Sequence, residues 1–104
     1  MAYMAYSDSN VMEQTRTKIA TPKSYYVVYL NDNKTTFEFV IESLVSIFNH
    51  SYESAQEVAK TVHESGSAVV EKGLLKSIAE TKCAIVMSNA ERYGYPLKAI
   101  AKQE

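Results

Sequence analysis

The chain has 104 residues, of which 46% are hydrophobic and 22% are charged, so we expect one compact domain with a single core. Eleven Lys/Arg against twelve Asp/Glu give a formal net charge of −1, which provides no broad basic face for nucleic acid. No apolar run approaches the roughly 20 residues that span a bilayer. The polar N-terminus, whose first cation is Arg16, is not typical of a secretory signal, and the single cysteine, Cys83, can form no internal disulfide. These features predict a cytoplasmic protein.

The first segment, residues 1–23, is polar and has neither strand nor helix periodicity. Pro22 lies near the end of this segment, where a proline is typical of a break between elements. We therefore expect a flexible N-terminal arm over residues 1–23 and a folded core over residues 24–104.

The run Tyr25–Leu30 is aromatic and β-branched, which predicts a mostly buried strand. A turn is expected over Asn31–Lys34, because Asn and Asp side chains bond to nearby backbone. Thr35 and Glu38 then have the spacing of a capping box at a helix start. The helix itself is predicted by one continuous apolar stripe, formed by Phe37, Val40, Ile41, Leu44, Val45 and Phe48.

A second helix is expected after Asn49-His50, with Ser51 as its N-cap and Gly66 at its end. Its inward face is predicted to carry small apolar residues, with His63 on the same side. These apolar residues are Ala55, Val58, Ala59 and Val62.

The rest of the chain predicts a brief strand at 68–70, a turn at 71–73, a third helix from about 74 to 93 and a last strand at 97–100. The third helix is expected to bury Leu75, Ala79, Cys83, Val86 and Ala90. The order is strand, helix, helix, strand, helix, strand. The predicted fold class is α+β (βααβαβ), with three helices packed on a small, mainly antiparallel three-stranded sheet.

Nothing in the sequence indicates catalysis. There is no G-x-S-x-G elbow, and Cys83 lies on an apolar helix stripe, where a small core side chain is expected. His50 and His63 lack the spacing of a zinc-binding helix. The glycines occur singly, so no phosphate loop is present. We expect a protein that is not an enzyme and has no metal or cofactor.

Polar residues nevertheless fall at two places that the fold could bring together. Asn31 and Asp32 follow the first strand, and His63 lies in the second helix. In one interpretation, which composition alone favours, the first two make a solvated turn and His63 lies at the core edge. In the other, a carboxylate, an amide oxygen and a neutral imidazole converge as acceptors for a compact cation such as an ammonium group.

Five spaced signatures within residues 25–100 favour the second interpretation, because in their order and spacing the sequence resembles the ClpS family. They are Asn31-Asp32-Asn33 with Thr35; Phe37-Glu38-Phe39-Val40-Ile41; Ala55 through Val62-His63 to Gly66; Ala79-Glu80-Thr81-Lys82; and Tyr95-Pro96-Leu97. Members of that family are adaptors of the N-end rule, which deliver proteins with destabilising N-terminal residues (N-degrons) to a ClpA-type unfoldase and its ClpP peptidase.

The resemblance implies a role for each matching position. Asn31, Asp32 and His63 would hold the substrate's α-amino group. A neighbouring pocket would take a first side chain such as Phe, Leu, Trp or Tyr. Its lining carries over to Thr35, Phe37, Val40, Ala59, Val62 and Leu97. Lys82 would contact the N-terminal domain of the ClpA-type unfoldase, although it could equally be a solvated helix cation.

Some positions depart from the family pattern. Asn33 stands where a second Asp is common, which removes one negative charge near the ammonium. Phe37 and Ala59 both replace a frequent Met, so we expect an altered pocket shape, and the ranking among Phe, Tyr, Trp and Leu is left open. Ser77 stands where a Glu contact to the unfoldase is usual.

Three alternatives remain at this point. A non-catalytic assembly domain resembling the C-terminal domain of the ribosomal stalk protein would have no ammonium site. The recognition module of a ubiquitin ligase is less expected, because the chain has no Cys/His zinc cluster. A small enzyme is disfavoured by the missing nucleophile and metal ligands.

Overall fold

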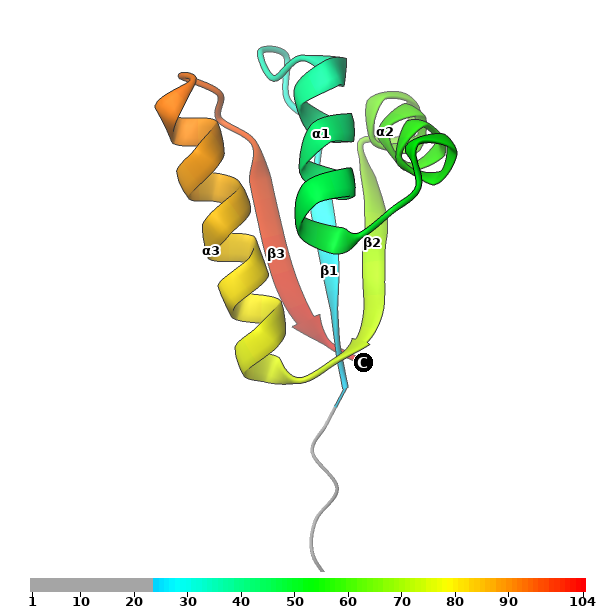
Figure 1. The fold of residues 1–104 in the computed structure, drawn as a ribbon, viewed down its shortest axis with the longest axis vertical. Coiled ribbons are helices and arrows are strands. Elements are labelled where there is room, and N and C mark those ends of the chain that lie inside the picture. Colours follow the sequence, from blue (N-terminus) through cyan, green and yellow to red (C-terminus); the bar gives the residue numbers. More distant parts are fainter. Residues whose placement is uncertain (1–23) are drawn as a thin grey trace, which may run out of the picture.

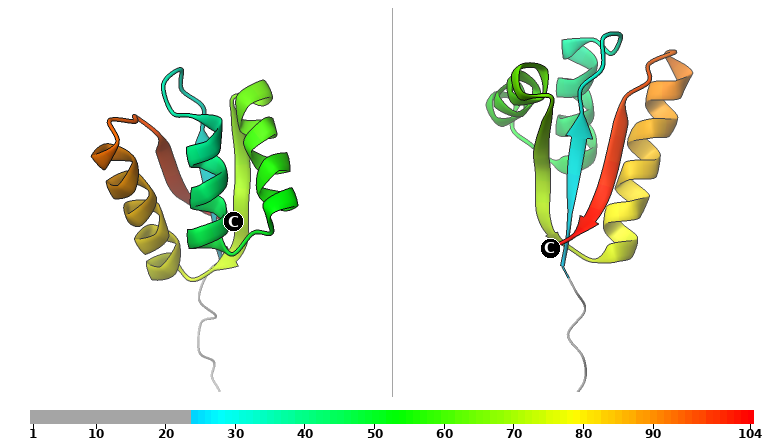
Figure 2. Two further views of the ribbon diagram at one scale, coloured as in Figure 1. Left: turned by 45° about the horizontal axis from the view of Figure 1, so that its top comes forward. Right: turned by 180° about the vertical axis from the view of Figure 1, so that it is seen from behind.

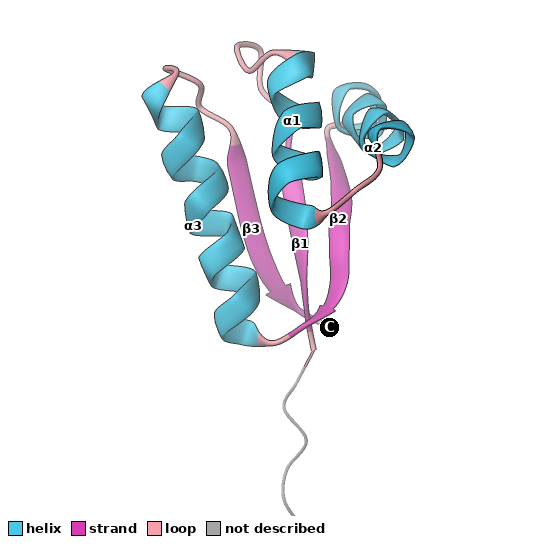
Figure 3. Cartoon of the chain, viewed as in Figure 1, coloured by secondary structure: helices cyan, strands magenta, loops and turns pink. Residues whose placement is uncertain are grey.

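The computed structural model describes residues 24–104, so the predicted arm, residues 1–23, lies outside the described residues. Six elements follow one another in the order β1 (Tyr25–Leu30), α1 (Phe37–Phe48), α2 (Tyr52–Ser65), β2 (Ser67–Leu74), α3 (Lys76–Arg92) and β3 (Lys98–Gln103). β1 is the central strand and pairs antiparallel with β2 and β3 (Figure 1). All three helices lie on one face of this sheet (Figures 2 and 3). The α+β prediction is confirmed.

Because the helices cover only one face of the sheet, the side chains of β1 fall into a buried set and a partly exposed set. Val27 and Tyr29 are fully buried under the helices, whereas Tyr26, Val28 and Leu30 on the opposite face stay partly exposed. The expectation of a mostly buried strand was therefore wrong for the outer residues. Run composition alone does not reveal which face of an antiparallel sheet stays open.

The helix ends are set by side-chain caps and left-handed residues. The Thr36 hydroxyl accepts a bond from the Phe39 N–H at 3.1 Å and caps α1, so the predicted Thr35 capping box was one residue too early. Ser51 caps α2 as predicted. At the helix C-termini, Asn49 and Gly66 take positive φ values of 60° and 91°.

The apolar stripe predicted for α1 is wider than the face of this helix that is buried. Val40, Ile41, Leu44 and Phe48 belong to the core, as predicted. Phe37 and Val45 are instead 42% and 38% exposed, because they lie at the margins of the stripe. His63 likewise belongs to the exposed side of α2 and not to its inward face.

β2 is longer than predicted. The expected turn at 71–73 is part of the strand, because two register shifts against β1 let the pairing continue to Leu74. Gly73 takes a φ of 70° there. Its N–H donates to the Glu104 carboxylate at 2.8 Å, which joins the end of β2 to the end of the chain.

α3 buries four of its five predicted core residues: Ala79, Cys83, Val86 and Ala90. Leu75 is the exception, since it is the N-cap residue and is 54% exposed. Burial raises the pKa of the Cys83 thiol, which agrees with its expected place as a core side chain.

A buried polar pair joins the central strand to α1. Ser43 Oγ donates to the Val40 carbonyl oxygen at 2.8 Å. Because the Ser43 hydroxyl proton takes part in that bond, the Tyr29 hydroxyl must be the donor in its own bond to Ser43 Oγ, at 2.7 Å. Burial raises the pKa of the Tyr29 phenol, which keeps it neutral and able to donate. Within residues 24–104, Ser43 Oγ is thus the only acceptor of this buried donor.

This arrangement predicts unequal costs for its two deletions. Ser43→Ala leaves the Tyr29 hydroxyl buried without an acceptor and should lower the free energy of unfolding by about 1–3 kcal/mol. Tyr29→Phe leaves Ser43 bonded to Val40 and should cost only about 0.5–1.5 kcal/mol. Urea unfolding of both single variants and of the double variant measures this. We expect the double variant to be no less stable than Ser43→Ala, and strict additivity would contradict the account.

Candidate functional site

Backbone pairing brings the two predicted polar groups to one end of the sheet. Leu30, the last residue of β1, pairs with Ser67 of β2. The next N–H, that of Asn31, donates to the Gly66 carbonyl oxygen at 2.9 Å. Since Gly66 directly follows α2, this bond places the loop after β1 beside the last turn of that helix, which carries His63.

The Asp32 carboxylate organises the loop between β1 and α1. Oδ1 accepts the N–H groups of Lys34 and Thr35 at 2.8 and 2.7 Å. Oδ2 accepts the Thr35 hydroxyl at 2.7 Å. Desolvation acts to raise the pKa of the Asp32 carboxyl, but the bonds from Thr35 and Lys34 outweigh it, and the net pKa lies below its usual range. Asp32 therefore stays anionic at neutral pH with its side chain held in one place.

A hollow of about 290 Å³ opens at this point between the loop, the start of α1 and the end of α2. Its lining is polar on the loop side and apolar on the helix side, and consists of Asn31, Asp32, Asn33, Thr35, Phe37, Val40, Ala59, Val62 and His63. Val40, Ala59 and Val62 are nearly fully buried. Phe37, which is 42% exposed, stands at the edge. One large apolar side chain fits such a hollow.

The structure thus gathers all but one of the residues assigned to the α-amino group and the side-chain pocket. Leu97 is the exception: it is 3% exposed in the core and is not among the lining residues. Asn33 joins the lining although it was noted only as a departure from the family pattern. Its place in the same turn as Asn31 and Asp32 was the signal that could have identified it.

The polar groups of this hollow retain hydrogen-bonding capacity. A carboxylate has about four lone-pair positions, and Asp32 uses three of them within the described residues. The Asn31 side chain and the His63 ring make no bond with any other residue of 24–104. An anionic oxygen, an amide oxygen and an imidazole nitrogen are therefore available as acceptors beside an apolar cavity.

Lys82, the predicted unfoldase contact, is not simply solvated. Its ammonium group lies 3.1 Å from Glu71 Oε1 and 5.2 Å from the centroid of the Phe48 ring. Its side chain is 26% exposed, and that of Glu71 is 33% exposed. Such a pair contributes about 0–1 kcal/mol, so Lys82 is oriented without being tightly held.

Within residues 24–104, no three His, Cys, Asp or Glu side chains come together as metal ligands. None of the helices in that range is both long and apolar enough to cross a membrane.

Comparison with known proteins shows which family the chain resembles. The model of the family described as "ATP-dependent Clp protease adaptor protein ClpS" matches residues 20–100. The ATP-dependent Clp protease adapter protein ClpS of Ruegeria pomeroyi is 39% identical over 94% of this chain and 86% of its own length. The corresponding protein of Campylobacter jejuni is 38% identical over 86% of this chain and 92% of its own length.

Among solved structures, Agrobacterium tumefaciens ClpS2 bound to L-phenylalaninamide is similar, with a TM-score of 0.77 and 37% identity. The match covers 81% of this chain and 100% of that one. A family model spanning most of the chain, relatives well above 30% identity and the same fold all agree. The chain belongs to the ClpS family of ATP-dependent Clp protease adaptor proteins.

Proposed function

We propose that this adaptor binds the free N-terminal residue of substrate proteins and delivers them to a Clp AAA+ protease in the cytoplasm. Its preferred first residues are bulky and hydrophobic: Phe, Leu, Trp or Tyr. The observation that carries the proposal is the placement of three acceptors with spare capacity beside an apolar hollow in one site. The ligand of the similar ClpS2 structure, L-phenylalaninamide, has the two groups this site suits: a free α-amino group and an apolar side chain.

Recognition of a chain end follows from the chemistry of the polar and the apolar side of the site. The ammonium group has three donors and no acceptor, which suits the Asp32 carboxylate, the Asn31 amide oxygen and a neutral His63. Burying a Leu or Phe side chain contributes about 1.5–3 kcal/mol, and a charge-assisted hydrogen bond about 1.5–3 kcal/mol. An internal or acylated residue supplies the first contribution and loses the second, so the site discriminates chain ends.

The proposed partner is a ClpA-type unfoldase, contacted through its N-terminal domain by Lys82. In that contact Lys82 exchanges Glu71 for an acidic group of the unfoldase. The exchange is feasible, since a partly exposed pair of this kind is weak. Ser77, exposed earlier on α3, offers no charge to the same surface.

The first prediction concerns the free amine. A labelled peptide that begins with Phe should bind at least about tenfold more tightly than the same peptide N-acetylated, because one lost charge-assisted bond is worth more than a factor of ten. Fluorescence anisotropy measures both affinities. Equal binding would mean a generic apolar groove, and no binding of either peptide would favour the assembly-domain alternative.

Asp32 can be tested without removing the turn it organises. In Asp32→Asn the amide oxygen can still accept from Lys34 and Thr35, while the amide nitrogen donates to the Thr35 hydroxyl. We expect binding of the Phe peptide to weaken at least about tenfold with the melting temperature nearly unchanged. Asp32→Ala should lose binding and also loosen the loop. Glu57→Gln on the exposed side of α2 makes the same charge change elsewhere and should leave affinity unaltered.

A third prediction is a pH dependence. His63 must be neutral to accept a bond from the ammonium, because a protonated imidazole has no acceptor and repels the ligand cation. The lowered pKa of Asp32 keeps its carboxylate ionised from pH 8 to pH 5, so Asp32 adds no titration in this window. Affinity should fall as pH falls from 7 to 5, a range in which the α-amino group of the peptide stays protonated, and the fall should be absent in His63→Gln. A flat profile for the unaltered protein would remove His63 from the acceptor role.

The fourth prediction concerns the shape of the cavity. Ala59 is 2% exposed on its wall, so Ala59→Met fills space and should weaken binding of peptides beginning with Trp or Tyr more than of those beginning with Leu. Phe37→Met changes the edge instead and should alter the tolerance for large rings. Competition among four peptides that differ only in the first residue gives the ranking. An unchanged ranking in both variants, with both still folded, would contradict a role for these positions.

A further inference from the structure

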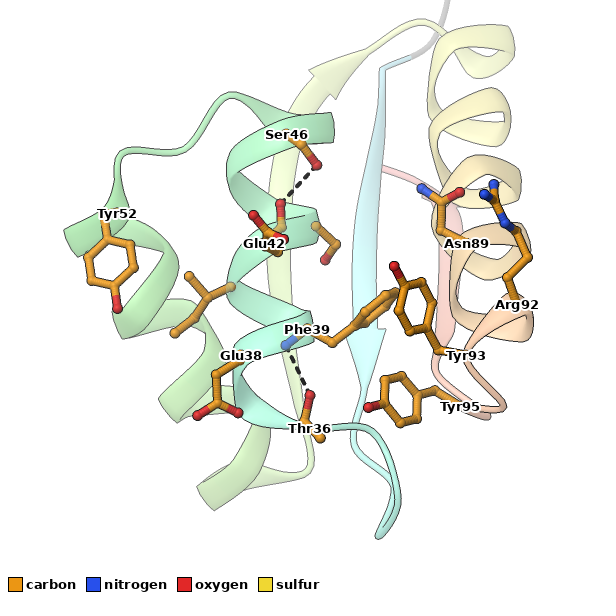
Figure 4. Close-up of a pocket in the computed structure, with 12 residues that line it drawn as sticks. Thr36, Glu38, Phe39, Glu42, Ser46, Tyr52, Asn89, Arg92, Tyr93 and Tyr95 are labelled. Carbon is orange, nitrogen blue, oxygen red and sulfur yellow. Dashed lines mark hydrogen bonds between the residues drawn. The ribbon is translucent and has the colours of Figure 1, made fainter.

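A second and larger hollow opens beside α1, and Figure 4 draws the residues that line it. Its volume is about 600 Å³, against about 290 Å³ for the first. The first turn of α1 serves both: Phe37 lines the smaller hollow, and Phe39 lines the larger. We call the larger one the α1–α3 groove. The residues that define it here are Glu38, Phe39, Glu42, Arg92, Tyr93 and Tyr95.

Three aromatic rings gather in this groove from two segments, α1 and the stretch that follows α3. The Phe39 ring lies 5.2 Å from that of Tyr95 and 5.5 Å from that of Tyr93. The two tyrosine rings are stacked with centroids 6.1 Å apart. Tyr93 is 67% exposed, so its ring meets solvent. Exposed aromatic faces attract cations through their negative potential.

The wall formed by α1 is acidic. Glu38 and Glu42 are one helical turn apart and both line the groove, and like charges at this spacing repel each other. Neither forms an ion pair with any residue of the described range. Glu38 lies in the first turn of α1, where the helix dipole favours an anion. Glu42 lies beyond the first turn, so the helix dipole does not explain a carboxylate at that position.

The opposite wall, on α3, contributes Arg92 and Asn89. Both side chains carry N–H donors suited to peptide carbonyl oxygens. A groove that offers carboxylate acceptors, N–H donors and aromatic rings matches an extended polypeptide with a basic side chain. The two carboxylates disfavour a phosphate-bearing ligand.

From this charge complementarity we propose that the α1–α3 groove binds a segment of a partner polypeptide that carries a lysine or arginine side chain. The cation contacts the Glu42 carboxylate and the aromatic rings, Glu38 adds negative potential from the other side of the first turns of α1, and Arg92 donates to the backbone of the segment. The segment needs no free N-terminus. This site is therefore separate from the proposed function and stands or falls independently of it.

The test uses the full chain, labelled with ¹⁵N, and an N-acetylated octapeptide with one central arginine. The matched probe has citrulline in place of arginine, which keeps the shape and removes the charge. We expect the arginine peptide to shift the amide signals of Phe39, Tyr93 and Tyr95, and the citrulline peptide to bind at least fivefold more weakly. Glu38→Gln with Glu42→Gln should weaken arginine-peptide binding to a similar extent.

The chain offers a closely matched control pair. Glu53 and Glu57 have the same four-residue spacing on α2 and are both exposed, and their double change to Gln should leave arginine-peptide binding unaltered. Tyr93→Ala should weaken binding, while Tyr93→Phe, which keeps the ring, should not. Dispersed amide spectra of every variant establish that each is folded.

Four outcomes would overturn the proposal. Equal binding of the arginine and citrulline peptides would remove the cation from recognition, and an unchanged affinity in the Glu38/Glu42 double variant would remove the acidic wall. Displacement of the arginine peptide by a free-amine Phe peptide would place the probe in the other hollow. Stronger binding after deletion of residues 1–23 would identify the chain's own N-terminal segment as the occupant. Failure of the Phe peptide to bind would contradict only the proposed function.

Discussion

One backbone hydrogen bond, from the Asn31 N–H to the Gly66 carbonyl oxygen, positions the whole site. It extends the β1–β2 pairing one step beyond the strand ends, and so fixes the loop that carries Asp32 against the end of the helix that carries His63. Without it, residues that are some thirty positions apart in the chain would have no common frame. The apolar lining depends on the same placement, because Ala59 lies one turn before His63 in that helix and Val62 directly before it.

The Asp32 carboxylate combines two tasks that are often separate. Its bonds to Lys34 and Thr35 shape the turn, and the same bonds lower its pKa and keep it charged. A carboxylate that is already oriented loses little freedom when it meets a ligand cation. The solvated-turn interpretation and the ammonium-site interpretation of Asp32 are therefore compatible, since the turn supplies the fixed charge that recognition requires.

Sequence reasoning identified the fold class, the element order, the caps Ser51 and Gly66, and most of the lining of the smaller hollow. The elements and caps follow from helix periodicity and turn residues, which are local signals, whereas the lining was implied by the resemblance to the ClpS family. Its errors share one cause: local patterns do not say what lies opposite. Leu75 has the character of a core residue but caps α3 at the surface. His63 follows an inward face and yet lies at an exposed edge.

The sequence by itself determined which residue types were available: paired acceptors after the first strand, a histidine in the second helix, and apolar residues at helical spacing between them. Only the tertiary structure decided which of these share a surface. It placed Leu97 in the core, brought Glu71 of β2 to Lys82, and assembled Phe39, Tyr93 and Tyr95 into one cluster. Such contacts depend on strand register and helix packing. Both are set when distant segments pair, and no single stretch of sequence encodes them.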